Sequence, residues 1–135
     1  MDPSKINWLA VVVATIAFFA LGALWYSPVL FVKTWMKELN ITKEDTKKAS
    51  MAKILPLTLI LTFIMVTNLA FFISDPKITV GQGALYGFLT GFGWVGLAMI
   101  LTSLYELKGW RYMFINAGYM AVGFTLSGVI LAAWK

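Results

Sequence analysis

Residues 80–134 read VGQGALYGFLTGFGWVGLAMILTSLYELKGWRYMFINAGYMAVGFTLSGVILAAW and decide the fold. They contain two long apolar runs, 80–105 and 110–134, separated by only four residues. Each run exceeds the roughly 20 helical residues that cross a hydrocarbon core about 30 Å thick. Because so short a link turns the chain straight back, the two runs are predicted to form an antiparallel helical hairpin.

Two more runs of similar length precede this hairpin, at residues 8–31 and 54–74. The first is too long for the apolar core of a secretory signal, so we expect it to be a helix of the mature fold. Residues 75–77 make a tight turn between the second and third runs. We therefore predict one all-α integral membrane domain over residues 1–135, with four transmembrane helices in an antiparallel bundle, at about 8–31, 54–74, 80–105 and 110–134.

The composition also indicates a protein that lies in a lipid bilayer. Of the 135 residues, 60% are hydrophobic and 13% are charged, and the mean hydropathy is +0.81. A typical soluble domain is about half apolar and about one quarter charged. The sequence has no Cys and no His, which excludes thiolate nucleophiles, Cys/His zinc sites, His-ligated haem and imidazole-based triads. We expect no metal and no other cofactor.

The net charge of +5 is spread unevenly along the chain. Segment 33–53 and the turn at 106–111 hold most of the basic residues: Lys33, Lys37, Lys43, Lys47, Lys48, Lys53, Lys108 and Arg111. The positive-inside rule predicts that these lie in the cytoplasm and that both termini lie outside. Segment Lys33–Lys53 is expected to contact anionic lipid. Nucleic acid is not an expected partner, because no aromatic residues alternate with the lysines.

The connection between the first two runs is expected to have structure of its own. Pro28 lacks an N–H and crowds the preceding turn, so it should break or kink the first helix. Apolar residues then recur at helical spacing: Phe31, Val32, Trp35, Met36 and Leu39. This spacing predicts an amphipathic interfacial segment between helices 1 and 2, and Thr42 with Asp45 resembles a capping box. The alternative is a solvated, lysine-rich turn.

Small residues form a stripe on each of the last two runs. Gly83, Gly87 and Gly91 are four residues apart, and at helical spacing their stripe continues through Ala98 and Thr102. The matching residues of the fourth run are Ala117, Ala121, Thr125, Gly128 and Ala132. Such stripes let two helices approach closely in lipid. They either pack the hairpin within one chain or form an interface between subunits, and the sequence leaves both open.

Polar residues gather at one predicted depth, near the cytoplasmic side: Trp25, Tyr26, Ser27, Ser103, Glu106, Asn116 and Tyr119. One interpretation is a binding pocket or the mouth of a pathway, with Glu106 as its titrating group. The other, which we favour, is a set of hydrogen bonds between helices. Asn68 is more isolated and is expected to bond another helix, with Asn7 as a candidate partner. Trp94 lies in mid-span, where we expect it to pack on a glycine groove rather than line a cavity.

Several stretches together resemble a bacterial membrane family catalogued as domain of unknown function 1761. They are Asn7–Val11 (NWLAV), Gly22–Pro28 (GALWYSP), Trp35–Leu39 (WMKEL), Thr42–Asp45 (TKED) and Ile115–Tyr119 (INAGY). The resemblance covers essentially the whole chain and implies a fold of four membrane helices, but no activity. The family often has histidine after the last tyrosine, where this chain has Met120.

The sequence favours a non-catalytic membrane protein of the bacterial inner membrane, either a homo-oligomer or an accessory subunit of a larger complex. The alternative is a small oligomeric transporter or channel, whose pathway the polar residues above would line. An enzyme acting on lipid is the weakest hypothesis, because general acid–base catalysis needs two positioned titratable groups and Glu106 has no second carboxylate nearby.

Overall fold

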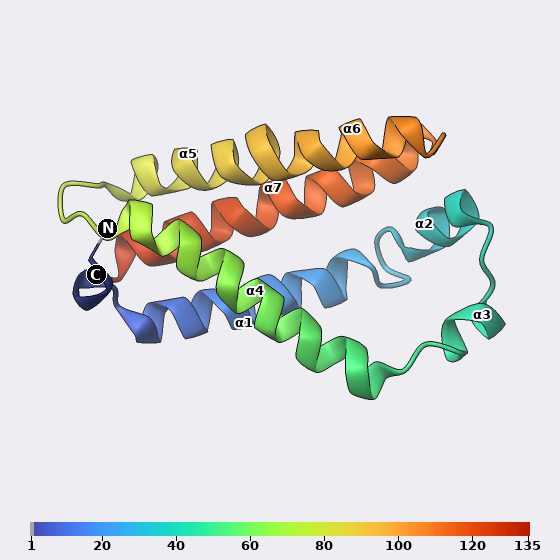
Figure 1. Ribbon diagram of the computed structural model, residues 1–135, viewed down its shortest axis with the longest axis horizontal. Coiled ribbons are helices and arrows are strands. Elements are labelled where there is room, and N and C mark those ends of the chain that lie inside the picture. The colour runs from blue at the N-terminus through green and yellow to red at the C-terminus, as the bar shows by residue number, and fades with distance from the viewer. Residues whose placement is uncertain (1) are drawn as a thin grey trace.

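The computed structural model describes residues 2–135, and all regular structure within them is helical. The elements in chain order are η1 (Pro3–Lys5), α1 (Trp8–Trp25), α2 (Val32–Leu39), α3 (Lys43–Lys47), α4 (Met51–Ile73), α5 (Val80–Thr90), η2 (Gly91–Gly96), α6 (Leu97–Tyr105) and α7 (Trp110–Ala133). Elements α5, η2 and α6 form one uninterrupted helix (Figure 1). Four helices are thus long and apolar enough to cross a membrane: Trp8–Trp25, Met51–Ile73, Val80–Tyr105 and Trp110–Ala133.

The first of these helices is shorter than the sequence predicted. α1 ends at Trp25 instead of residue 31, and Pro28 lies in the turn that follows. Proline has no N–H with which to continue the helical hydrogen-bond ladder. The chain turns instead, and the N–H of Phe31 donates to the carbonyl of Trp25 at 3.1 Å. This early turn brings α2 back against the end of the molecule where α7 begins (Figure 1).

α7 is the central helix of the molecule. Half of its most apolar stretch is buried, against 28% or less for the other three long helices. It contacts α1, α2, α4, α5, η2 and α6. The other long helices share few contacts with one another, apart from α1 with α4, so α7 holds the fold together.

α4 packs along only part of its length. Its buried residues are Thr62, Val66, Leu69, Ala70 and Ile73, all in the second half of the helix. There they join the main apolar core with residues of α1 and α7, including Val11, Phe18 and Phe124. The first turns of α4 diverge from the other helices (Figure 1), and almost every residue from Met51 to Leu61 is exposed.

A π-helical segment, η2, changes which residues of the third long helix face α7. We expected the glycine stripe to continue through Ala98 and Thr102, but both are exposed, and Gly96 and Ser103 are buried instead. A π-turn accommodates one extra residue. The stripe therefore steps by five residues between Gly91 and Gly96 and is displaced beyond that point.

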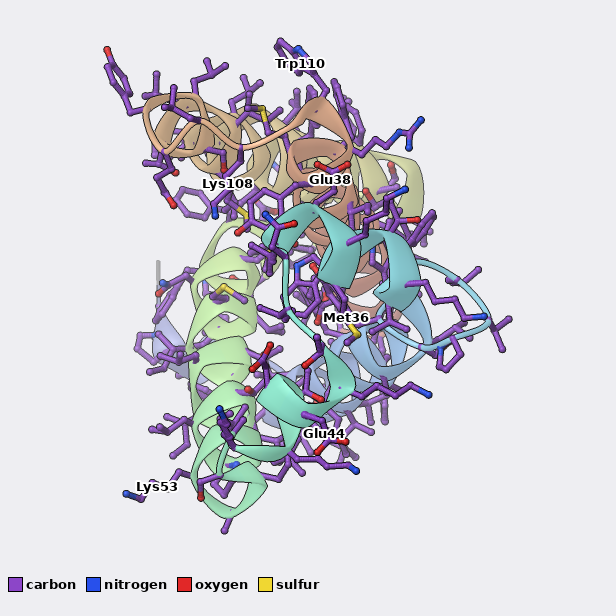
Figure 2. All side chains as sticks on the ribbon, turned by 90° about the vertical axis from the view of Figure 1, so that its right-hand side faces the viewer. Met36, Glu38, Glu44, Lys53, Lys108 and Trp110 are labelled. Carbon is purple, nitrogen blue, oxygen red and sulfur yellow. The ribbon has the colours of Figure 1, made fainter. Side chains whose placement is uncertain are left out.

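The segment between α1 and α4 contains two short helices at the end of the molecule opposite the termini (Figure 1). The capping box predicted at the start of α3 is present, with Thr42 and Asp45 each accepting a hydrogen bond from the other's backbone N–H. α2 contacts α7. Its Glu38 carboxylate lies against Gly109, the residue just before α7, as the view from this end indicates (Figure 2).

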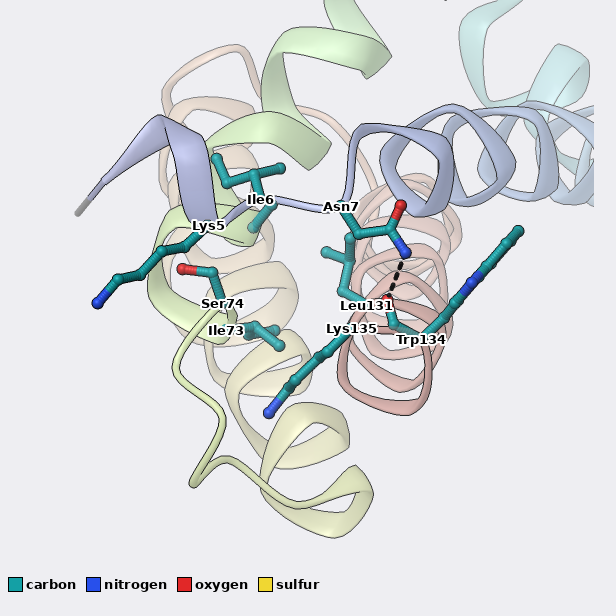
Figure 3. A pocket seen from close by; sticks show the side chains of 9 residues that line it. Lys5, Ile6, Asn7, Ile73, Ser74, Leu131, Trp134 and Lys135 are labelled. Atoms are coloured by element: carbon teal, nitrogen blue, oxygen red, sulfur yellow. Dashed lines mark hydrogen bonds between the residues drawn. The ribbon is translucent and has the colours of Figure 1, made fainter.

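Both termini and the turn between α4 and α5 meet at the other end of the molecule. The side chain of Asn7 accepts from the N–H of Ala10 at 3.2 Å and donates to the carbonyl of Trp134 at 3.1 Å (Figure 3). The Lys135 ammonium donates to the carbonyls of Asp75, at 2.6 Å, and Ile78. Asn7 therefore caps α1 and ties it to α7, and the expected pairing of Asn7 with Asn68 is wrong.

Candidate functional site

Four of the predicted polar residues meet where the end of α1 contacts α7. The indole Nε1 of Trp25 donates to the carbonyl of Ile115 at 2.8 Å. The Tyr26 hydroxyl donates to Oδ1 of Asn116 at 2.6 Å, and the Tyr119 hydroxyl donates to the carbonyl of Phe18 at 3.2 Å. Each donor therefore has its acceptor on the opposite helix. We call Trp25, Tyr26, Asn116 and Tyr119 the α1–α7 cluster.

Aromatic rings fill the space around Tyr119. Its ring makes edge-to-face contacts with Phe18 and Tyr26, with centroids 5.3 and 5.5 Å apart, and lies 6.4 Å from the ring of Trp25. Such edge-to-face pairs add to the apolar burial. The backbone of α1 also comes close, because a Cβ on Gly22 would lie 2.6 Å from the Tyr119 hydroxyl oxygen. Tyr119 is therefore packed tightly between the two helices.

Three other predicted members do not join this cluster. The Ser27 hydroxyl donates to the carbonyl of Leu24 at 2.6 Å, within its own turn. Ser103 is buried, but it lies on α6, and Glu106 is exposed in the turn after α6. The prediction from depth alone failed here because α7 contacts both α1 and α6, whereas α1 and α6 share almost no contacts.

The geometry of the α1–α7 cluster joins the two helices through three hydrogen bonds. The expected pocket placed Glu106 with these residues, but Glu106 is exposed in the turn after α6 and bonds to none of them. Hydrogen bonds between membrane helices contribute about 0.6 kcal/mol each on average, with a maximum near 1.7. Three of them, together with the ring contacts, fix the end of α1 on α7.

The two small-residue stripes meet within the chain. A Cβ on Gly83 would collide with Ala132 and with the carbonyl of Gly128, and one on Gly87 would collide with the carbonyl of Phe124. Gly91 faces Met120 and Ala121 in the same way, and Gly96 faces Ala117. As the residue number rises along the third long helix, the number of its contact falls along α7, so the two run antiparallel. The two stripes therefore pack against each other within one chain.

A groove that the sequence did not predict runs between α4 and the third long helix. It measures about 500 Å³ and is lined by Leu69, Phe72, Ile78, Tyr86, Leu89, Thr90 and Trp94. An adjoining hollow shares Leu69, Phe72 and Thr90 with it and adds the side chain of Asn68. We call the two together the α4–η2 groove.

The α4–η2 groove contains two further residues whose expected roles the structure corrects. Trp94 is 80% exposed, so it lines a hollow and does not pack on glycine. Asn68 is exposed as well, so no other helix covers its amide. In the sequence, the only indications of this surface were an isolated Asn and an isolated Trp within apolar runs. Without knowing where α4 diverges, the sequence could not place them on one surface.

The fold and the α1–α7 cluster define the class of this protein. It is an all-helical chain with four helices compatible with a membrane protein. Two of these helices are joined by hydrogen bonds that aromatic side chains donate. The chain belongs to the family described as a protein of unknown function (DUF1761), which matches residues 9–132, so the resemblance seen in the sequence is confirmed. The search of curated proteins and the search of solved structures each gave no match. The segments GALWYSP and INAGY, which carried that resemblance, are the ones that meet in the cluster.

Proposed function

We propose that this protein is a non-catalytic, multi-pass subunit of the bacterial inner membrane that works as a homo-oligomer, in its simplest form a dimer joined through the α4–η2 groove. Its four long helices would span the bilayer as an antiparallel bundle. The basic segment Lys33–Lys53 would lie in the cytoplasm against anionic lipid, with both termini outside. The observation that carries the proposal is an exposed asparagine, Asn68, in an apolar helix beside the α4–η2 groove.

The position of Asn68 makes exposure to lipid costly. It precedes the end of α4 at Ile73 by five residues, about 7 Å at 1.5 Å per residue, so in a membrane it would lie inside the hydrocarbon layer. A polar group there is stabilised when it finds a hydrogen-bond partner. An amide has a carbonyl acceptor and two N–H donors, so it is complementary to a second amide.

A second copy of the chain supplies that partner most simply. Across a two-fold axis each surface patch meets its own equivalent, so the two Asn68 amides would pair reciprocally. The same contact would cover the apolar side chains of the groove, including Trp94 and Phe72. The exposed first half of α4 would gain a packing partner in the same assembly.

The arrangement of the α1–α7 cluster supports a non-catalytic role. Its side chains bond to one another and to the backbone, and the carboxylate nearest in sequence, Glu106, is exposed elsewhere. The alternative of a transporter whose pathway runs through this cluster is disfavoured by the ring of Tyr119, which fills the space between the helices.

Native mass spectrometry from nanodiscs tests the proposal with the variant Asn68→Leu. We expect the wild-type chain to be a dimer, and the variant to dissociate about 5- to 30-fold more readily, because such a bond is worth about 1–2 kcal/mol in model helices. Thr67→Val is the matched control, since the Thr67 hydroxyl already bonds to the carbonyl of Phe63 in its own helix. A monomeric wild-type chain, or equal effects of the two variants, would overturn the proposal.

A further inference from the structure

A second groove lies at the end of the molecule where the basic residues gather. It measures about 340 Å³ and is lined by Trp25, Phe31, Thr34, Arg111, Phe114 and Ile115. These residues come from the end of α1, the following turn, α2 and the first turns of α7. We propose that this groove binds one anionic phospholipid, with its phosphate on Arg111 and Thr34 and an acyl chain along the aromatic side chains. The proposal rests on the membrane insertion proposed above.

The charge of the groove fits a phosphate. Arg111 is exposed, and the ion pairs among residues 2–135 join other residues, Lys47 to Glu44 and Lys48 to Asp45. The Glu38 carboxylate lies against Gly109, two residues before Arg111, and forms no ion pair with Arg111. A guanidinium binds phosphate oxygens through two parallel hydrogen bonds. Thr34 adds a hydroxyl at the same groove.

The floor of the groove fits an acyl chain. The rings of Trp25 and Phe31 pack with their centroids 4.9 Å apart. The only polar atom of the Trp25 side chain is already bonded to the carbonyl of Ile115, so the surface that it offers is apolar. Phe114 extends this surface along α7 and is 54% exposed. A ligand that fits must therefore have an anionic end and an apolar body.

The depth of the groove selects a membrane lipid. Arg111 is the second residue of α7, so in a spanning helix it would lie at the edge of the hydrocarbon layer, where lipid phosphates are. The aromatic floor continues from there toward the middle of the bilayer. Basic side chains between membrane helices on the cytoplasmic face are a recurrent way of holding anionic headgroups.

The test measures lipids retained by the full chain in native mass spectrometry from nanodiscs that contain phosphatidylglycerol and phosphatidylcholine. We expect the wild-type chain to retain one phosphatidylglycerol and Arg111→Gln to bind it about 10- to 100-fold more weakly, as loss of charge-assisted hydrogen bonds implies. Arg111→Lys should be intermediate, because an ammonium lacks the two-pronged geometry. Thr34→Val should bind phosphatidylglycerol a few-fold more weakly. Circular dichroism checks that each variant keeps its helices.

Lys47→Gln is the matched control, because it removes the same charge from α3, away from the groove. Equal losses in Arg111→Gln and Lys47→Gln would overturn the proposal in favour of diffuse attraction to the basic segment. Equal retention of phosphatidylcholine, or displacement of the lipid by inorganic phosphate alone, would overturn it as well. The same spectra report the number of chains, so a failure of the dimer is read separately from a failure of this groove.

Discussion

Tyr26 and Asn116 illustrate how one hydrogen bond joins two distant parts of the chain. They are 90 residues apart in sequence and 2.6 Å apart between Oη and Oδ1. Both lie among aromatic and apolar side chains, where an amide without a partner is costly. This hydrogen bond gives both polar groups a partner across the two helices.

We therefore predict that Tyr26→Phe and Asn116→Ala each lower the free energy of unfolding and that their effects are not additive. A double-mutant cycle should give a coupling of about 0.6 kcal/mol and below about 2. Tyr105→Phe is the control, because Tyr105 is 85% exposed and should tolerate the change. Unfolding in mixed micelles with increasing denaturing detergent measures the wild-type chain, the two single variants, the double variant and the control. Independent effects of Tyr26→Phe and Asn116→Ala would mean that the bond does not stabilise the fold.

For individual residues, the sequence predicted part of the candidate site. Trp25, Tyr26, Asn116 and Tyr119 could be grouped because hydropathy fixes depth in a spanning helix. Depth does not fix the direction in which a side chain leaves its helix, nor which helices are neighbours. Glu106 and Ser103 were misplaced for that reason, since α7 separates their helix from α1.

Among the secondary-structure elements, the third long helix and α7 approach each other most closely where the third helix has glycine. The carbonyl of Phe124 lies where a Cβ on Gly87 would be, whereas nothing lies within 4 Å of a Cβ on Gly93. Backbone cannot yield as a flexible side chain does. Gly87 and Gly93 therefore differ in the space available for a side chain, although they are six residues apart in one helix.

We predict that Gly87→Ala destabilises the fold by about 1–3 kcal/mol, as overpacking does. Gly93→Ala should be neutral or slightly stabilising, because alanine is the better helix former and the added methyl meets no neighbour. Thermal unfolding in mild detergent, followed by circular dichroism, compares the two. If both variants melt alike, the close contact of the third helix with α7 is not a source of stability.

The four long helices could be predicted because their apolar runs are long and their links are short. The π-helical segment could not, since patterns at helical spacing assume a constant turn. Its extra residue exchanged Ala98 and Thr102 for Gly96 and Ser103 on the buried face. The end of α1 was also misjudged, because the apolar run continues after Pro28 although the helix does not.

For the whole molecule, the two ends differ in charge and in the elements they contain. The termini and the turn between α4 and α5 form one end, and α2, α3 and the turn before α7 form the other (Figure 1). The divergence of α4 between these ends was not predictable, since surfaces that face lipid and surfaces that face a partner are equally apolar.

The proposed orientation predicts how single cysteines react in whole cells. The natural sequence has no Cys, so Ser4→Cys and Lys47→Cys each introduce a unique thiol at opposite ends of the molecule. A membrane-impermeant maleimide should label Ser4→Cys in intact cells and Lys47→Cys only after permeabilisation. The reverse pattern would place the basic segment outside, against the positive-inside rule.

The central position of α7 has a consequence for how the protein is made. α1, α4 and the third long helix leave the ribosome before α7, although α7 is the neighbour that all of them contact. At about 5–20 residues per second, several seconds separate the synthesis of α1 from that of α7. Until α7 is made, the glycines of the third helix have no partner to cover them. Assembly of this fold therefore waits for the last of its four long helices, and translation that stops before Trp110 yields three helices of which mainly α1 and α4 contact each other.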